Sequence, residues 1–231
     1  MSTTAEGEPP VVAAIYTGRG LDEQVLAVAR EILGDARLTS VIDDSIIFDI
    51  NRHGAITPAI TRRILRYYAN AADAGADVIF NTCSSIGEIV EIGRRTVGVP
   101  IVRIDEPMAE LAVASFGRIG VLATLPSTLG PTHRLLLEKA ATQGREVEVI
   151  AEVAHGAYEA LARGDAASHD ELVAEAVAKL GSGVDGVVLA QASMARMRDR
   201  LEAPTNVPVL TSIRLGLEAV RAALATTPPA R

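Results

Sequence analysis

The sequence predicts an α/β protein in which two similar lobes each carry a mostly parallel sheet flanked by helices. Apolar segments of strand length alternate with segments of helical periodicity along nearly the whole chain. The strand segments are continuous apolar runs, which is typical of parallel strands that helices cover on both faces. The chain also repeats itself at a constant offset of 108 residues, which indicates that one lobe duplicates the other.

The first lobe is expected to follow a loose tail at residues 1–10. A helix after the first strand has apolar residues at a period near 3.6, and acidic residues end the second strand. The segment 45–57 has an irregular pattern, whereas Thr57-Pro58 indicates a helix start, because threonine caps helices and proline suits their first position. Strands are expected at 11–16, 38–42, 77–81 and 99–104, and helices at 22–33, 58–74, from Ser85 and from Glu106.

The alternation starts again at Arg118. A helix is expected to follow Pro131, and Ser168 with Glu171 makes a capping box for a later helix. The strands of this half are expected at 118–124, 146–151, 185–190 and 208–210, and its later helices at 155–162, from 168 and from 211 to about 225.

The repeat predicts how the lobes are divided. At the offset of 108 residues Gly75 meets Gly183, and Asp77 meets Asp185. We therefore expect two Rossmann-like lobes related by a pseudo-two-fold axis, with a small-molecule site in the cleft between them. The lobes are expected to comprise residues 11–105 with 211–231, and residues 106–210.

Composition argues against several classes of protein. The formal net charge is −7 and no Lys/Arg cluster is interleaved with aromatic residues, so a nucleic-acid surface is not expected. No apolar run approaches the roughly 20 residues that span a bilayer, and the polar N-terminus does not resemble a secretory signal. A single cysteine cannot form an internal disulfide, which suits the cytoplasm. The four histidines are far apart in the sequence, so no metal site is expected, and no phosphate-binding loop is present.

The single cysteine, Cys83, stands at a turn between a buried strand and a helix. Open α/β sheets bind ligands at the carboxyl ends of their strands, and the positive end of a helix favours a thiolate. Ser85 and Glu88 have the spacing of a capping box for that helix. A lone cysteine is also often only a small buried hydrophobe. Position alone therefore leaves a catalytic and a structural interpretation of Cys83 open.

The repeat favours the catalytic interpretation. It places Gln191 at the position equivalent to Cys83, and Ser193 at the position equivalent to Ser85. The two strand-to-helix corners are then expected to face one another across the cleft, one with a thiol and the other with an amide.

Further side chains and backbone groups are expected to bind a substrate near these corners. Ser85 and Ser193 could instead serve only as helix caps. Asp43 and Asp44 are interpreted as a solvated turn. The expected substrate-binding residues are Thr17, Gly18, Ser84, Ser85, Thr124, Gln191 and Ser193.

Four short segments of the chain carry a family resemblance: GADVIFNTCSS, VPIVRIDEP, RIGVLAT and DGVVLAQAS. Taken together and in this order, they resemble the aspartate/glutamate/hydantoin racemase superfamily, and the resemblance covers nearly the whole chain in architecture. It implies proton transfer, without a cofactor, at the carbon next to the carboxylate of a small acid or amino-acid derivative, and it suggests a homodimer. Racemases of this superfamily place a cysteine at each corner, so that one removes the α-proton and the other returns one on the opposite face.

The chain departs from that pattern at Gln191, because a glutamine amide has no useful acid or base pKa. Single-cysteine members of the superfamily resemble arylmalonate decarboxylases, in which a thiol protonates an enediolate on one face. We therefore expect a racemase-like isomerase in which Cys83 is the acid or base. A decarboxylase or lyase is the main alternative, and a cis-trans isomerase stays open. A protein that binds small carboxylates without turnover is the alternative from another class.

Overall fold

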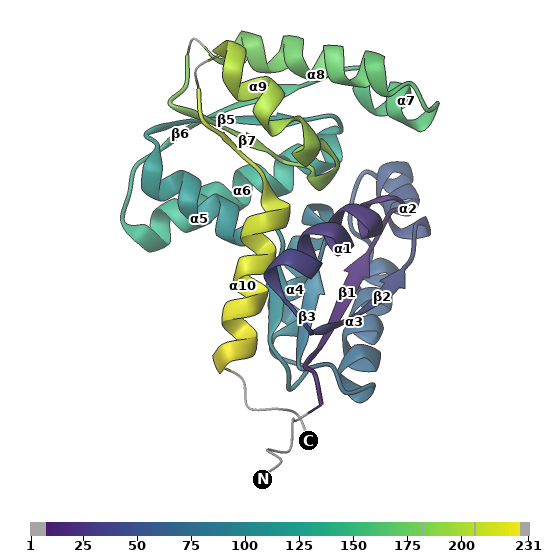
Figure 1. Cartoon of the computed structure of the whole chain (residues 1–231). Helices are drawn as coiled ribbons and strands as arrows, with labels where there is room; N and C mark the ends of the chain where they lie inside the picture. Colours follow the sequence, from purple (N-terminus) through teal and green to yellow (C-terminus); the bar gives the residue numbers. More distant parts are fainter. Residues whose placement is uncertain (1–7, 182, 206, 227–231) are drawn as a thin grey trace.

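The computed structural model describes residues 8–181, 183–205 and 207–226 and consists of two lobes, each built on a four-stranded parallel sheet (Figure 1). The strand orders are β2-β1-β3-β4 and β6-β5-β7-β8, and every described strand pair is parallel. The predicted α/β class with two similar lobes is therefore confirmed. Residues 1–7 of the expected tail lie outside the described residues.

Helices flank both sheets. A short 3₁₀ helix follows the third strand, in chain order, of each sheet: η1 follows β3 and η2 follows β7. The first half of the chain contains β1 (Val11–Tyr16), α1 (Leu21–Ile32), β2 (Arg37–Ile42), α2 (Ser45–His53), α3 (Pro58–Asp73), β3 (Val78–Asn81), η1 (Ser84–Ile86), α4 (Gly87–Gly93) and β4 (Ile101–Arg103). The second half contains α5 (Glu106–Ser115), β5 (Arg118–Ala123), α6 (Pro126–Gln143), β6 (Glu148–Val153), α7 (Ala157–Ala162), α8 (Ala166–Gly181), β7 (Gly186–Leu189), η2 (Ala192–Met197), α9 (Arg198–Thr205), β8 (Val209–Leu210) and α10 (Ser212–Thr226).

The internal repeat is visible in the backbone. Helices α3 and α8 have equal lengths and begin 108 residues apart, and so do strands β3 and β7. The aspartates before the two strands also act alike. Asp77 accepts the backbone N–H of Val11 at 2.7 Å, and Asp185 accepts that of Arg118 at 2.7 Å, so each carboxylate secures the start of a central strand.

The two halves exchange a helix. Helix α5 follows β4 of the first sheet but packs in a core cluster with β5 and β7 of the second. Helix α10 follows β8 of the second sheet but packs against α1, β3 and β4 of the first, and it also contacts α5 (Figure 1). The chain therefore crosses between the lobes twice. The exact lobe limits, 11–105 with 211–231 and 106–210, stay a prediction.

The segment 45–57, which the sequence presented as irregular, contains helix α2. Ile46 and Ile50 lie one turn apart and are both buried, which is the minimum apolar stripe for a short helix. Gly54 ends the helix in the left-handed conformation, with φ of 67°. The next start was predicted well, because Thr57 accepts the N–H of Ile60 at 3.3 Å and α3 begins at Pro58.

Three other helix starts differ from prediction. Ser85 lies inside η1, so the capping box with Glu88 does not form. Helix α6 begins at Pro126, and the proline expected at its start, Pro131, lies within it. Helix α8 begins before Ser168, whose N–H is accepted by Asp165 at 3.0 Å. Asp165 therefore provides the cap that was assigned to the serine, because it is the residue immediately before the helix.

Candidate active site

Cys83 lies at the carboxyl end of β3, in extended conformation with φ of −124° and ψ of 115°, immediately before η1. The cysteine is partly exposed. Strand β1 pairs with β3, so the segment after β1 lies beside the cysteine, and the hydroxyl of Thr17 interacts with the thiol. Thr17 is buried and Gly18 is partly exposed. The structure thus brings the first predicted corner together from two neighbouring strands.

The surroundings of the thiol act on its pKa in opposite directions. Burial raises the pKa of Cys83, and the hydroxyl of Thr17, the backbone N–H groups of Ser85 and Ile86 and the hydroxyl of Ser85 lower it. Burial has the larger effect, so the net pKa of the thiol is raised. The N–H groups at the helix terminus thus favour the thiolate, as expected, but burial outweighs them. A protonated thiol is suited to giving a proton rather than taking one.

Two buried side chains lie beneath this corner, and sequence reasoning missed both. The Tyr68 hydroxyl donates to Asn81 Oδ1 at 2.9 Å, and Asn81 Nδ2 donates to the carbonyl oxygen of Cys83 at 3.0 Å. Both side chains are fully buried. One signal in the sequence could have found Asn81. It is the only polar residue of the run VIFN, and the repeat has a leucine, Leu189, at the equivalent position.

A buried ion pair supports the same corner from the other side. Arg103 donates to both carboxylate oxygens of Asp105, at 2.8 and 2.9 Å, and both residues are buried. The guanidinium group lies against Gly87, the first residue of α4, where there is no room for a Cβ atom. Glycine at this position therefore allows the turn after Cys83 to pack closely on the ion pair.

The second corner is also built from two neighbouring strands. Gln191 follows β7, and its Oε1 accepts the backbone N–H of Thr124 at 2.5 Å and the hydroxyl of Thr124 at 3.0 Å. Thr124 follows β5 and is buried. The amide oxygen is thus occupied, and the NH₂ group is the part of Gln191 that remains to donate a hydrogen bond. Ser193 lies in η2 and is partly exposed.

Both corners lie where the two lobes meet. Ala192 of η2 belongs to a core cluster that includes Tyr16 and Phe80 of the first sheet. On the other side, η1 contacts α6. The hydroxyl of Ser127 in α6 donates to Asn51 Oδ1 in α2 at 2.9 Å. The arrangement is consistent with the repeat, because each lobe supplies one strand-to-helix corner to the boundary.

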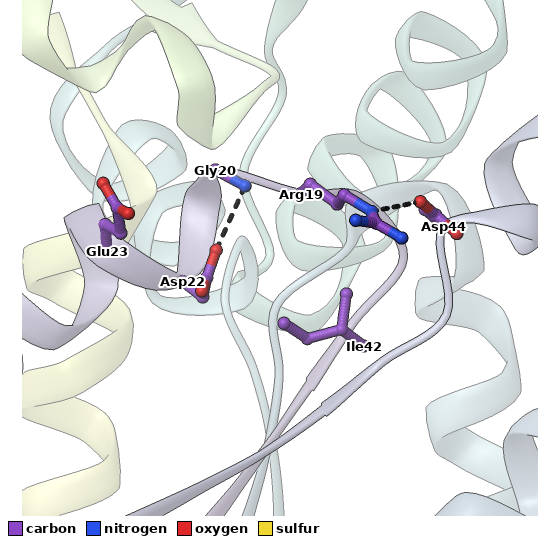
Figure 2. Close-up of a pocket in the computed structure, with 6 residues that line it drawn as sticks. All are labelled: Arg19, Gly20, Asp22, Glu23, Ile42 and Asp44. Atoms are coloured by element: carbon purple, nitrogen blue, oxygen red, sulfur yellow. Dashed lines mark hydrogen bonds and ion pairs between the residues drawn. The ribbon is translucent and has the colours of Figure 1, made fainter.

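A cavity of about 460 Å³ lies at the carboxyl ends of β1 and β2. Figure 2 shows the residues that line it. Arg19 reaches across it to Asp44, with 2.5 Å between Nε and Oδ2, and Gly20 donates its N–H to Asp22 at 3.0 Å. The cavity adjoins the loop of Thr17, but its lining does not include Cys83. Its lining residues are Arg19, Gly20, Asp22, Glu23, Ile42 and Asp44.

Asp43, expected in a solvated turn, is mostly buried. It accepts the Tyr67 hydroxyl at 2.6 Å and the Ser45 hydroxyl at 2.7 Å, and it also pairs with Arg63. Burial acts to raise the pKa of this carboxyl, but these three partners outweigh it and hold the pKa below its usual value. The residue therefore joins β2, α2 and α3, which no local sequence pattern indicated.

Metal-binding clusters and membrane-spanning helices are both absent from the part of the chain that the structure describes. No group of three or more His, Cys, Asp or Glu side chains there is placed to hold a metal ion. Every helix between residues 8 and 226, as far as it is described, is too short or too polar to cross a membrane.

Comparisons with known proteins point in one direction. The profile of the Asp/Glu/hydantoin racemase family matches residues 20–220. A search of curated proteins found no match.

Similar folds occur among solved structures. Allantoin racemase from Klebsiella pneumoniae is 19% identical, with a TM-score of 0.71 over 94% of this chain and 88% of that one. Glutamate racemase from Francisella tularensis, in complex with D-glutamate, is 14% identical, with a TM-score of 0.73 over 94% and 81%. A glycine-to-cysteine mutant of arylmalonate decarboxylase in a sulfate-associated form is 15% identical, with a TM-score of 0.60 over 94% of each chain. At these identities the likeness shows the fold alone.

Proposed function

Because the chain belongs to the Asp/Glu/hydantoin racemase family, we propose that it is an enzyme that transfers a proton at the carbon next to a carboxylate. The substrate is a small acid or amino-acid derivative, and Cys83 is the acid or base. The observation that carries this proposal is the position of the only cysteine, at a strand-to-helix corner on the boundary between the lobes, with two hydroxyl groups interacting with its thiol. Thr17, Gly18, Ser84, Ser85, Thr124, Gln191 and Ser193 are proposed to hold the substrate.

A racemase cycle asks for two groups. One removes the α-proton, the electron pair moves into the carboxylate to give an enediolate, and another group returns a proton on the opposite face. Cys83 can serve one face. Gln191 cannot serve the other, because an amide is neither a useful acid nor a useful base and its oxygen already accepts two hydrogen bonds from Thr124. Inversion therefore requires a second acid or base from another residue.

The Gln191 arrangement favours decarboxylation as a second candidate function. A substrate with two carboxylates on one carbon loses carbon dioxide, and the electron pair of the broken bond stays as an enediolate. The protonated Cys83 thiol then gives its proton to one face of that carbon, and the thiolate recovers a proton from solvent. Donors at both corners, such as the hydroxyl of Ser85 and the NH₂ group of Gln191, would stabilise the enediolate oxygens.

Incubation in deuterated water separates the two reactions. The substrates are aspartate, glutamate, a 5-substituted hydantoin and a 2-aryl-2-methylmalonate. Deuterium exchange at the α-carbon without carbon dioxide release supports an isomerase. Carbon dioxide release with a single deuterated enantiomer supports a decarboxylase.

Replacing the thiol tests the proposed role of Cys83. Cys83→Ala should lower turnover by about 10²–10⁴-fold while the fold persists. The matched control is Thr142→Ala, an exposed position on α6, which should leave turnover unchanged. Wild-type turnover that survives Cys83→Ala would remove Cys83 from the chemistry. Carboxylate binding that is independent of Cys83, with no turnover of any substrate, would instead indicate a binding protein.

Three further properties stay proposals with simple tests. A homodimer predicts twice the chain mass in light scattering after size-exclusion chromatography. Action without metal or cofactor predicts full turnover after prolonged dialysis against a chelator. A cytoplasmic location predicts the activity in the cytoplasmic fraction of the source cell.

A further inference from the structure

We propose that Tyr68 and Asn81 are positioning residues, which hold the backbone of Cys83 in place through two buried hydrogen bonds. This inference rests on the proposed function, because it gives the two residues a task in the chemistry of Cys83. Neither residue needs to touch a substrate.

The two bonds run in one direction, from the helix to the corner. Tyr68 on α3 donates to Asn81 Oδ1, and Asn81 Nδ2 donates to the Cys83 carbonyl, at 2.9 and 3.0 Å. Together they fix the orientation of the Asn81 amide, because the flipped amide would set its oxygen against the carbonyl oxygen of Cys83. Burial raises the pKa of Tyr68, and the nearby Cys83 raises it further, so the phenol stays neutral and keeps its proton to donate.

The backbone on both sides of the cysteine is held. Before it, the N–H and the hydroxyl of Thr82 both donate to the carbonyl of Ile15, at 3.1 and 2.8 Å. After it, the Cys83 carbonyl accepts Asn81 and, at 3.4 Å, the N–H of Ile86. Because a trans peptide is planar, the Asn81 bond also fixes the direction of the following N–H, that of Ser84. The direction in which the thiol leaves the backbone is then set by four hydrogen bonds.

The repeat shows that the fold itself does not require this support. The residues 108 positions after Tyr68 and Asn81 are Ala176 and Leu189. They lie in α8 and β7, which correspond residue by residue to α3 and β3, and both are buried. Both belong to one apolar core cluster, and α8 contacts β7, so the second lobe has apolar residues at the two equivalent positions. The polar pair occurs only in the lobe whose corner carries the thiol.

The unique thiol allows a test that needs no substrate. The rate of Cys83 alkylation by iodoacetamide, measured from pH 6 to 11, reports both the pKa and the accessibility of the thiol. The variants are Tyr68→Phe, Asn81→Leu and the double variant. The double variant recreates an apolar pair and removes the buried Tyr68 hydroxyl that Asn81→Leu alone would leave without its partner, so it should melt closer to wild type than Asn81→Leu does.

The matched control is Tyr67→Phe, which removes the same hydroxyl one residue earlier. Tyr67 bonds to Asp43 rather than to the cysteine corner. It should therefore keep the wild-type alkylation profile.

If Tyr68 and Asn81 position Cys83, the pKa and the accessibility of the thiol should change in all three variants, including the double variant. A released corner exposes the thiol, so its pKa should fall and alkylation at pH 8 should be faster by about 3–10-fold. With a turned-over substrate, kcat should fall by about 10–100-fold with little change in KM, because misplacement by about 1 Å has effects of this size. Tyr68→Phe, which removes one of the two bonds, should give the smallest change.

Each outcome decides between a positioning and a structural role. A wild-type alkylation profile in a folded double variant overturns the proposal, and so does failure of all three variants to fold, since the pair would then be structural. The proposed function can fail independently. If no substrate is turned over but the variants change the alkylation of Cys83, the positioning role of Tyr68 and Asn81 stands and the proposed function fails. If turnover depends on Cys83 but the variants do not change it, the proposed function stands and only the positioning role fails.

Discussion

Replacing Gly87 by alanine should lower the melting temperature substantially, because the new Cβ atom would overlap the guanidinium group of Arg103. The Cβ would lie 2.5 Å from Nε and closer still to Cζ and Nη2. The guanidinium group cannot move aside freely, since it is buried and makes two hydrogen bonds to the fully buried Asp105. Breaking such a pair from one side costs about 3–5 kcal/mol. We expect a loss of about 3 kcal/mol in the free energy of unfolding, or about 6–12 °C.

The measurement is thermal unfolding at neutral pH, followed by calorimetry or circular dichroism. The control is Gly98→Ala, which has no atom within 4 Å of the added Cβ and should change stability by less than about 0.5 kcal/mol. A double-mutant cycle locates the effect. In an Arg103→Ala background, Gly87→Ala should be much less harmful, because the overlapping atoms are gone. The reasoning is refuted if Gly87→Ala melts like wild type, or if its cost is the same in both backgrounds.

Two further predictions concern α5 and α3. Burial would raise the pKa of Glu106, but hydrogen bonds from Arg94 and Lys139 hold it at about 2. A carboxyl whose pKa is lowered stabilises the folded state above pH 4.5, and this stability, here about 3 kcal/mol, is lost as the pH falls toward 2. In urea unfolding, Glu106→Gln should therefore lose this dependence of stability on pH. Glu148→Gln, in an exposed ion pair, should keep it, and an unchanged Glu106→Gln profile would refute the assignment. Thr57→Ala should cost about 1 kcal/mol in the same assay while Thr57→Ser costs less, and equal losses would argue against capping.

Periodicity predicted the fold well where a long apolar face decides the structure. Strand β1 has the predicted limits, and α3 starts where Thr57-Pro58 indicated, since cap and proline are local effects. Helix α2 was missed because its buried stripe consists of Ile46 and Ile50 alone. The serine caps failed for another reason. A serine three residues before a glutamate is compatible with several helix starts, and packing selects among them.

The repeat predicted which segments form the candidate site, but not the contacts that their side chains make. The repeat located Gln191 as the counterpart of Cys83 and correctly indicated a second strand-to-helix corner. It could not indicate that Thr124 would occupy the amide oxygen of Gln191, or that Tyr68 would reach the corner from α3. These contacts join residues distant in sequence, and only the packed lobes bring them together. The net direction of the Cys83 pKa also depends on burial, which the helix-terminus argument did not include.

The exchange of α5 and α10 bears on how the protein is completed during synthesis. Apolar residues of the first sheet, including Val12, Phe80 and Ile104, share one core cluster with Leu217 and Val220 of α10. Many multidomain chains finish their N-terminal domain while the rest is still being made. Here α1 can cover part of that face early, but the part that packs on α10 stays uncovered until residues 212–226 have left the ribosome. Cys83 packs with a different core cluster, so a nascent chain carries its only thiol on a lobe whose second apolar cluster is still incomplete.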